Sequence, residues 1–398
     1  MKAGLDDFKP EGRRVLVRVD FNVPLREDGS IRDDARMRAA LPTIRELIDG
    51  SAKVVVATHL GRPKGRVVPG LSTRPLAQHL GQLLGREVAW CPECVGSEAE
   101  AAVAELPAGG VLMLENLRFH PEEEANDPEF SAQLARLADV YVNDAFGTAH
   151  RAHASTVGVA HRLPAYAGRL MERELGALGG ILEDPVQPLL AVLGGSKLST
   201  KLGVIDNLLP RVTQLFLGGG MAATFLKAEG MPVGRSLVEP DFVPRAADLL
   251  GRAPQLGAEV ELPSDVVVAN SPEAGPGAAR VCAVSEVGPE DMILDVGPRT
   301  LDRWVGLVSR AGTVVWNGPL GVYENPAFAT GTRRLAEAIA ASPAVSVTGG
   351  GDLQAALEAL GLSSGFTHVS TGGGATLEFL EGRELPGVAA LREVVVAR

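Results

Sequence analysis

Two lysines that follow a glycine pair are the residues of this sequence best suited to hold a chain of phosphate groups. Gly194 and Gly195 end an apolar run, and Lys197 and Lys201 follow them at a spacing of four. If a helix begins after the glycines, the two ammonium groups lie on one helix face near its N-terminus, where they repel each other and the helix dipole. A bound polyphosphate makes this arrangement favourable, whereas the alternative is an ordinary solvated helix face. An ammonium also supplies a compact, movable charge that a planar guanidinium does not.

Three runs of glycine each follow an apolar run directly, which is typical of loops that bind anions. Glycine lets backbone N–H groups approach a ligand with no Cβ in the way, and the N-terminus of a following helix favours negative charge. Tight turns are the competing interpretation of any single run, but they explain three such runs poorly. The P-loop and dinucleotide patterns are absent, so a mononucleotide is the expected ligand. The runs are Gly218, Gly219 and Gly220; Gly349, Gly350 and Gly351; and Gly372, Gly373 and Gly374.

A carboxylate stands next to the second of these glycine runs. Asp352 directly follows Gly351, and Mg²⁺ in nucleotide sites is held by one or two carboxylates together with phosphates. The alternative is that Asp352 only caps the N-terminus of a helix. Both interpretations stay open on these residues alone, and Mg²⁺ is the cofactor that we expect.

Four arginines and a histidine lie in or beside segments that end apolar runs in the first half of the chain. Bidentate guanidinium groups suit carboxylate and phosphate oxygens, so their convergence predicts a pocket for a small polyanionic substrate. Pro42 fits only the first turn of a helix, which leaves Arg36 near or before the start of that helix. Asp20 and Asn22 add hydrogen-bonding groups for a substrate hydroxyl. The basic residues are Arg36, His59, Arg62, Arg118 and Arg151.

Three other patterns are discounted. Cys91 and Cys94 have the spacing of half a zinc site, but no second pair matches it, so free thiols are expected. His150 and His153 are interpreted as core or hydrogen-bonding histidines rather than metal ligands. The acidic run 122–124 is interpreted as the solvated start of a helix.

Short apolar runs alternate with helix-like stretches along the whole chain, which indicates the α/β class with parallel strands buried on both faces. The runs are too many for one sheet, and they divide around the segment 165–188, interpreted as a junction helix. Ligands of open parallel sheets bind at the carboxyl ends of the strands, where the residues above stand. The runs are 15–20, 53–60, 87–90, 111–117 and 140–144 before the junction, and 188–195, 214–220, 264–269, 292–298, 313–319, 344–351 and 367–374 after it.

Composition excludes several classes of protein. The chain carries 38 basic and 49 acidic side chains, and the resulting net charge of −11 argues against a nucleic-acid partner. Its 398 residues, 45% of them hydrophobic and 22% charged, are typical of a globular protein of two or three domains. No apolar run is long enough to span a membrane, and the first residues lack the apolar core of a secretory signal. Three cysteines in a chain of this size favour the cytoplasm.

The segments that carry these residues resemble the phosphoglycerate kinase family, and the resemblance runs nearly end to end. The longest matching segment is DVYVNDAFGTAHRAHAST (139–156), and together the matching segments are far more specific than any glycine run. The other matching segments are RVDFNVP (18–24), HLGRP (59–63), LENLRFH (114–120), LGGSKLSTK (193–201), WNGPLGVYENPAF (316–328), GGGD (349–352) and STGGGATLEFLEG (370–382).

The resemblance implies a monomeric enzyme of two facing Rossmann-like domains joined by a hinge, each with a mainly parallel sheet flanked by helices. Residues 1–170 would bind phosphoglycerate, with residues of about 380–398 returning to this domain, and 171–379 would bind the nucleotide. The implied reaction is reversible transfer of a phosphoryl group from 1,3-bisphosphoglycerate to MgADP, which gives 3-phosphoglycerate and ATP.

The resemblance also implies roles for single residues. Arg36, Lys197, Gly372 and Gly373 would stabilise the moving phosphoryl group, and Asp352 would lie near the metal. The phosphoglycerate would be held by Asp20, Asn22, Arg36, His59, Arg62, Arg118 and Arg151. The nucleotide would contact Lys201, Gly218, Gly219, Gly220, Asn317, Glu324, Gly349, Gly350, Gly351 and Asp352.

Two departures from the family pattern bear on the phosphate contacts. Thr200 stands where the family commonly has Asp, and Leu353 stands where it commonly has Thr. Two alternatives remain beside the family function: another nucleotide-dependent carboxylate kinase, and a sensor with a decayed site. A decayed site predicts the loss of Lys197, Arg36 or Asp352, and all three are present.

Overall fold

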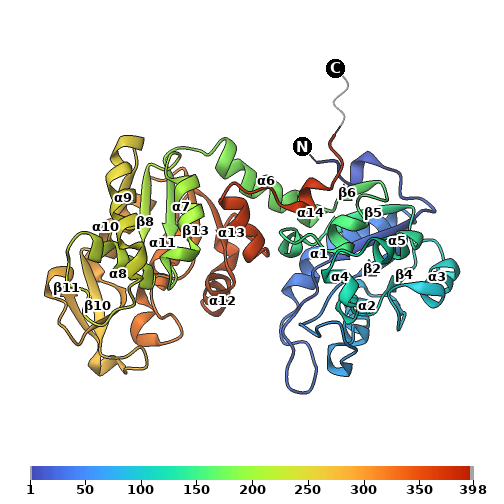
Figure 1. Cartoon of the computed structure of the whole chain (residues 1–398), viewed down its shortest axis with the longest axis horizontal. Coiled ribbons are helices and arrows are strands. Elements are labelled where there is room, and N and C mark those ends of the chain that lie inside the picture. The colour runs from blue at the N-terminus through green and yellow to red at the C-terminus, as the bar shows by residue number, and fades with distance from the viewer. Residues whose placement is uncertain (1, 395–398) are drawn as a thin grey trace. The chain divides into compact units, whose positions relative to one another are not determined.

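The computed structural model describes residues 2–394, which divide into two compact units. Unit 1 consists of residues 1–176 and 384–398, and unit 2 consists of residues 177–383. Helix α6 (Arg169–Glu183) begins in unit 1 and ends in unit 2 (Figure 1). Residues 395–398, the end of the predicted returning segment, lie outside the described residues.

Unit 1 contains a parallel sheet of six strands in the order β3-β4-β2-β1-β5-β6. Its strands are β1 (Arg14–Val19), β2 (Lys53–Ala57), β3 (Ala89–Trp90), β4 (Val111–Met113), β5 (Val140–Asp144) and β6 (Ala165–Ala167). Its helices, besides α6, are α1 (Ala35–Asp49), α2 (Arg74–Leu84), α3 (Gly96–Glu105), α4 (Pro121–Glu124), α5 (Pro128–Arg136) and α14 (Pro386–Ala389).

Alternating side chains of these strands face two different environments. Val15, Val17 and Val19 of β1 pack into a large apolar core with Met37 and Ile44 of α1. The intervening side chains of β1 point to the opposite face of the sheet, because successive strand residues alternate. That opposite face includes the buried Arg18, which is 1% exposed.

Unit 2 contains a second parallel sheet of six strands, in the order β15-β14-β13-β7-β8-β9, and a separate antiparallel sheet in the order β11-β10-β12. The strands are β7 (Leu189–Leu193), β8 (Gln214–Leu217), β9 (Glu259–Glu261), β10 (Asp265–Ala269), β11 (Arg280–Ala283), β12 (Met292–Val296), β13 (Thr313–Asn317), β14 (Val345–Gly349) and β15 (His368–Val369). The helices are α7 (Leu202–Leu208), α8 (Gly219–Ala228), α9 (Val243–Arg252), α10 (Pro298–Val308), α11 (Thr330–Ala340), α12 (Gly351–Ala359) and α13 (Gly374–Leu380).

In both six-stranded sheets the chain starts near the middle, builds outward in one direction and then crosses to the other side. The reversal falls between β1 and β5 in unit 1 and between β7 and β13 in unit 2. In open parallel sheets, ligands bind beyond the carboxyl ends of the strands at such a reversal. The residues after β1 and β7 are therefore the places in each unit to look for a site.

Several expectations about the elements require correction. The segment 165–188 begins with strand β6 rather than with a helix. The sequence analysis also missed strands β9 and β11, because their residues are partly exposed and lack a long apolar run. Without β11, it did not predict the antiparallel sheet either. Pro42 lies inside α1 instead of in its first turn. It is exposed there, so water can replace the missing backbone donor.

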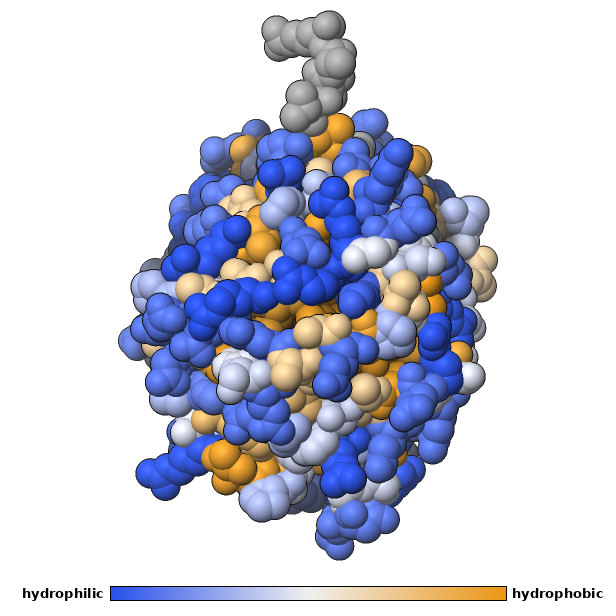
Figure 2. Space-filling view, turned by 90° about the vertical axis from the view of Figure 1, so that its right-hand side faces the viewer, coloured by the Kyte–Doolittle hydropathy of each residue, from blue (hydrophilic) through white to orange (hydrophobic). Residues whose placement is uncertain are grey.

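The surface of unit 1 seen in Figure 2 is mostly hydrophilic and is interrupted by apolar patches. Within residues 2–394, no helix is both long enough and apolar enough to cross a membrane.

Candidate active site

The first cluster of candidate residues lies beyond β1 and β2 in unit 1. The Arg36 guanidinium, in the first turn of α1, donates a hydrogen bond from Nη1 to Asp20 Oδ2 at 3.0 Å. His59 Nδ1 lies 3.9 Å from Asp20 Oδ1. The Asn22 side chain accepts a hydrogen bond of 2.8 Å from the Gly61 N–H, which ties the loop after β1 to the loop after β2. These residues are distant in the sequence, and the sheet brings them together.

Arg118 joins the same cluster from a single-turn 3₁₀ helix after β4, Leu117–Phe119. It is only 4% exposed, and its Nη1 donates to the Gly61 carbonyl at 2.9 Å. Its Nε lies 3.2 Å from Glu124 Oε1, close enough for an ion pair but without hydrogen-bond geometry. Its Nη2 is fully buried and has no hydrogen-bond partner within the described residues. Because an unpaired buried donor is costly, this guanidinium is suited to an anionic ligand.

Two histidines beside these arginines are held neutral. Burial lowers the pKa of His59 well below its usual 6.5, and the charges of Arg18, Arg118, Arg151 and Arg36 lower it further. Burial also lowers the pKa of His153 to about 4, again with help from the arginines. Because their pKa values are low, these rings are poor proton acceptors near pH 7. A neutral imidazole still carries one N–H group, so each ring can donate a hydrogen bond to an oxygen.

We call Asp20, Arg36, His59, Arg118 and Arg151 the arginine cluster. Arg151 Nε donates to His150 Nε2 at 3.2 Å, and the Arg151 charge acts on both neutral histidines. Arg62 differs from the others. It is exposed and makes no hydrogen bond or ion pair within residues 2–394, so the structure does not link it to the cluster.

The second group of candidate residues surrounds the carboxyl ends of β7 and β13 in unit 2. Lys201 Nζ donates to Asn317 Oδ1, and Asn317 Nδ2 donates to the Gly349 carbonyl at 2.8 Å. Burial lowers the pKa of Lys201 to about 8, although the charges of Asp352 and Glu381 act to raise it. The pKa of such a lysine lies close to neutral pH, and a nearby anion raises this pKa and favours the charged form.

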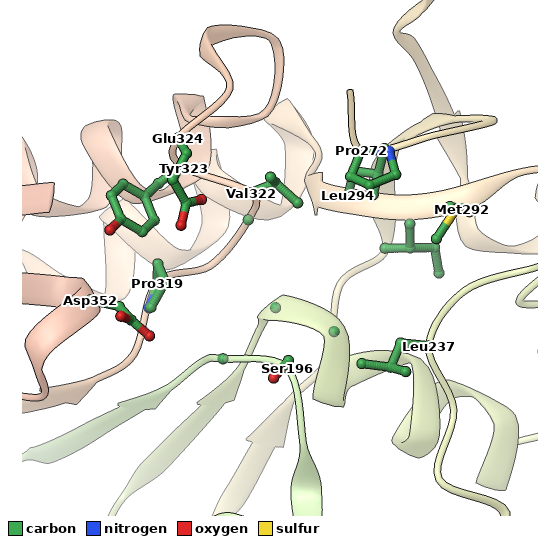
Figure 3. Close-up of a pocket in the computed structure, with 15 residues that line it drawn as sticks. Ser196, Leu237, Pro272, Met292, Leu294, Pro319, Val322, Tyr323, Glu324 and Asp352 are labelled. Atoms are coloured by element: carbon green, nitrogen blue, oxygen red, sulfur yellow. The ribbon is translucent and has the colours of Figure 1, made fainter. Parts of the chain in front are cut away.

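A cavity of about 370 Å³ opens beside this group, and we call it the glycine cavity. Figure 3 shows the carboxylates of Glu324 and Asp352 on one side and the apolar side chains of Leu237 and Met292 on the other. A molecule with one apolar end and one polar end fits such a lining. The lining residues are Gly195, Ser196, Gly219, Gly220, Leu237, Pro272, Met292, Ile293, Leu294, Pro319, Gly321, Val322, Tyr323, Glu324 and Asp352.

Backbone packing at the floor of the glycine cavity requires glycine. The Gly195 N–H donates to the Pro319 carbonyl, and the Gly195 carbonyl accepts from the Met221 N–H. Gly219 has a φ of +66°, and a Cβ there would lie 2.5 Å from the Gly195 carbonyl oxygen. A side chain at position 219 is therefore excluded both by conformation and by space.

Gly220 also lines the glycine cavity, but the other glycines of the three predicted runs are not among its lining residues. Gly218 donates its N–H to the Leu193 carbonyl and packs against Leu320, so it serves the sheet. Gly350 caps α12, whose first residue is Gly351. Gly372 donates its N–H to Ser370 Oγ, and Gly373 caps α13 with a φ of +50°. Helix α13, which follows this last loop, lies next to β14, because a Cβ on Gly349 would meet Thr376 Cγ2 at 2.6 Å.

The expected helical pairing of the two lysines is wrong. Lys197 is extended and precedes a single-turn 3₁₀ helix, Leu198–Thr200, whereas Lys201 caps α7. Gly195, with a φ of +102°, and the 3₁₀ turn delay the start of α7 until after both lysines. The two ammonium groups therefore do not share a face of one α-helix.

Comparison with known proteins points to one family. A family model described as phosphoglycerate kinase matches residues 5–383. The phosphoglycerate kinase of Moorella thermoacetica is 55% identical over 392 residues, which cover 98% of this chain and 99% of the relative. That of Chloroflexus aurantiacus is 54% identical over 397 residues, with the same coverage. The chain belongs to the phosphoglycerate kinase family.

Solved structures of phosphoglycerate kinases share the fold. The structure from Coxiella burnetii has a TM-score of 0.90 at 41% identity, and the one from Pyrococcus horikoshii has a TM-score of 0.85 at 37% identity. Each comparison covers 98% of both chains. As a phosphoglycerate kinase, the chain is a transferase that moves a phosphoryl group to or from a carboxyl group.

Both departures from the phosphoglycerate kinase pattern have a local use. The Thr200 hydroxyl donates to the Lys197 carbonyl at 2.9 Å and so supports the 3₁₀ turn. Leu353 is fully buried in the apolar core of unit 2, together with Trp316 and Leu357. Neither side chain is available to contact a phosphate, because the Thr200 hydroxyl bonds within its own turn and Leu353 packs in the core.

The sequence analysis did not predict that two charged side chains of unit 1 are buried. Arg18 in β1 is 1% exposed, and Glu123, expected to be a solvated residue, is fully buried and accepts two hydrogen bonds from Ser155. The only available signal was an arginine inside the apolar run VLVRVD at 15–20. Leu237 of the glycine cavity carried no signal, since isolated apolar residues are common everywhere, and Met292 was predicted only as the first residue of the apolar run 292–298.

Proposed function

We propose that the arginine cluster binds phosphoglycerate and that the glycine cavity binds the MgADP or MgATP of the phosphoglycerate kinase reaction. The observation that supports this most is the buried Arg118, whose Nη2 has no partner among the described residues. A carboxylate or phosphate oxygen satisfies that donor and offsets the charge of the surrounding arginines. Asn22 and Arg62 complete the phosphoglycerate site in this proposal.

Phosphoryl transfer in this site requires no general base. In the direction of ATP formation, a β-phosphate oxygen of ADP attacks the phosphorus of the acyl phosphate. The bond from phosphorus to the acyl oxygen breaks, and its electron pair stays on the carboxylate of 3-phosphoglycerate. A carboxylate is ionised at neutral pH, so no proton has to move. The neutral His59 and His153 are consistent with a site built to hold charge rather than to accept protons.

Catalysis in this proposal is positioning and charge stabilisation. Lys197, Arg36 and the backbone N–H groups of Gly372 and Gly373 stabilise the phosphoryl group during transfer. Lys201, Asn317 and the loop 349–351 hold the nucleotide phosphates, and Gly218, Gly219 and Gly220 give the nucleotide a close approach to the backbone. Glu324 and the apolar side of the glycine cavity hold the ribose and the base.

Mg²⁺ accompanies the nucleotide in this proposal, and the residues present fit it. Asp352 stands in the first turn of α12 and lines the glycine cavity. A single carboxylate suits an ion that takes its other ligands from phosphates and water. When bound, Mg²⁺ would neutralise phosphate charge.

A coupled assay tests the proposed substrate. ATP formation from MgADP is measured with 1,3-bisphosphoglycerate as the phosphoryl donor and, in parallel, with acetyl phosphate. We expect turnover with the first donor and almost none with the second, because acetyl phosphate lacks the groups that the arginine cluster binds. Equal turnover with both donors would indicate a different carboxylate kinase.

We also propose that the protein is a cytoplasmic monomer whose two units are joined by a hinge. Transfer requires reacting atoms about 3–3.5 Å apart and a site closed to water, yet both substrates must enter and leave. Closure therefore has to depend on both ligands, each of which supplies part of the differential binding. Small-angle scattering should show a smaller radius of gyration with both ligands bound than with either one, and an unchanged radius would contradict the proposal.

A further inference from the structure

A chain of buried hydrogen bonds links four side chains of unit 1 and ends at the arginine cluster. Only the last of the four, His59, has a role in the proposed reaction. Glu123 accepts from the Ser155 backbone N–H at 2.9 Å and from the Ser155 hydroxyl at 2.5 Å. Ser155 Oγ in turn accepts from Arg18 Nε at 2.8 Å. Arg18 Nη2 lies 3.2 Å from His59 Nδ1. The chain of contacts therefore runs from a buried carboxylate to a residue of the arginine cluster.

Every member of this chain is fixed in place. Arg18, Ser155 and Glu123 are each at most 1% exposed. Arg18 Nη1 also donates to the Val19 carbonyl, and the Tyr141 hydroxyl donates to the Ser155 carbonyl at 2.8 Å. The Arg18 guanidinium thus makes three polar contacts at once, with Ser155, Val19 and His59. Since its fork is planar and rigid, its Nη2 cannot turn away from His59 without breaking the other bonds.

The contact between Arg18 and His59 determines which ring nitrogen of His59 carries the proton. A guanidinium only donates hydrogen bonds, so His59 Nδ1 must be the acceptor. The low pKa of His59 keeps the ring neutral, which leaves its single proton on Nε2. Nε2 makes no hydrogen bond within the described residues, yet it is not among their fully buried unpaired atoms. It is therefore the ring atom available to a ligand.

We propose that Arg18, held by Ser155 and Glu123, is a positioning residue that keeps the His59 proton on Nε2, so that this atom donates to an anionic oxygen of the substrate. The proposal rests on the proposed phosphoglycerate site. Without Arg18 the ring would be free to place its proton on Nδ1 and to turn toward Asp20, whose Oδ1 is 3.9 Å away. Nε2 would then present a lone pair to the anion, which repels it.

A purely structural role for Arg18 makes a different prediction. In that case the chain only neutralises buried charge, and breaking it lowers stability without changing the state of His59. A readout of the ring nitrogens distinguishes the two roles. It requires no bound ligand, so it decides the tautomer even if the phosphoglycerate assignment is wrong.

The experiment is ¹⁵N NMR of histidine-labelled full-length protein at pH 7, together with calorimetric titration of 3-phosphoglycerate and of MgADP. In the unmodified protein we expect His59 to show an unprotonated Nδ1 and a protonated Nε2. Ser155→Ala removes the acceptor that orients Arg18 but keeps every charge. It should produce a mixture of His59 tautomers and weaken 3-phosphoglycerate binding by about 3- to 10-fold, the effect of one hydrogen bond. MgADP binding should not change.

Two further variants are controls, and a third extends the test. Ser131→Ala removes another buried hydroxyl of unit 1, one that donates to the Asp127 carbonyl, and should leave His59 unchanged. Ser155→Thr keeps the hydroxyl and should restore the Nε2–H tautomer. Arg18→Lys keeps the charge without the fork and should mix the tautomers more than Ser155→Ala does.

The proposal is overturned if His59 carries its proton on Nδ1 in the unmodified protein. It is also overturned if Ser155→Ala behaves like Ser131→Ala, or if Ser155→Ala weakens 3-phosphoglycerate binding while the tautomer stays unchanged. A protein that binds no 3-phosphoglycerate overturns the proposed function and the ligand role of His59, whereas the nitrogen shifts still decide whether Arg18 sets the tautomer.

Discussion

The arginine cluster of unit 1 and the glycine cavity of unit 2 stand at corresponding places of two six-stranded parallel sheets, yet they offer different surfaces. In unit 1 the strand ends present buried charged side chains, such as Arg118, with unused donors. In unit 2 they present backbone, because Gly195 and Gly219 leave no room for side chains. In our proposal the same architecture therefore serves two kinds of anion recognition: a rigid fork that fits one small substrate, and a close backbone approach that fits a long phosphate chain.

Lys197→Ala should have the largest effect, because this lysine is proposed to act on the moving phosphoryl group. We expect turnover to fall by about 10²- to 10³-fold, the typical cost of one preorganised donor to a transition state. MgADP affinity should change much less. Steady-state kinetics and calorimetry measure the two quantities, and turnover within a few-fold of the unmodified protein would show that Lys197, which is exposed, takes no part in the transfer.

Gly219→Ala tests the backbone side of the comparison. The new Cβ would lie 2.5 Å from the Gly195 carbonyl oxygen at a positive φ, so the floor of the glycine cavity has to move. Strain of about 1–3 kcal/mol should weaken MgADP binding by about 5- to 150-fold and leave 3-phosphoglycerate binding unchanged. Gly251→Ala in α9 is the control, since nothing lies within 4 Å of its Cβ position. Equal behaviour of the two variants in calorimetry would argue against a steric requirement.

Arg118→Lys tests the side-chain part of the comparison. The substitution keeps the charge but loses the planar pair of donors, so 3-phosphoglycerate binding should weaken by about tenfold. MgADP binding should remain unchanged, because Arg118 belongs to unit 1. Calorimetry with each ligand separately provides the measurement. A matched loss of both affinities would contradict the assignment of one ligand to each unit.

The pH dependence of nucleotide binding should show a smaller effect, confined to unit 2. Lys201 has its pKa lowered to about 8 in the free protein, and bound phosphates raise that pKa. MgADP binding near pH 8 should therefore take up protons, and the affinity should fall by a few-fold as pH rises through 8. Calorimetry in buffers of different ionisation enthalpy measures this uptake. Lys201→Arg should abolish it, and uptake that persists in this variant would assign the proton to another group.

Much of this comparison could be predicted from the sequence. Apolar runs ending in glycine or in polar residues marked the strands that build both sites, since a buried parallel strand has to be apolar until it reaches the sheet edge. Strands β6, β9 and β11 were missed because they are short, and β9 and β11 are also partly exposed, so their residues form no continuous apolar run.

The remaining site features depend on tertiary structure. Glu123 lies in an acidic run that looks solvated, and only its packing against Ser155 shows that it is buried. The separation of Lys197 from α7 depends on the positive φ of Gly195, which spacing alone does not predict. The apolar side of the glycine cavity comes from segments near residues 237, 272 and 292, which converge only in the folded unit.

The most direct test of the division between the two units is to follow backbone amide resonances of the full chain while each ligand is titrated alone. 3-Phosphoglycerate should shift amides near Asp20, His59 and Arg118 and leave those of the glycine cavity unchanged. MgADP should shift amides near Gly219 and Asp352 and leave the arginine cluster unchanged. If MgADP instead shifted the arginine cluster, or 3-phosphoglycerate the glycine cavity, the assignment of one ligand to each unit would be wrong.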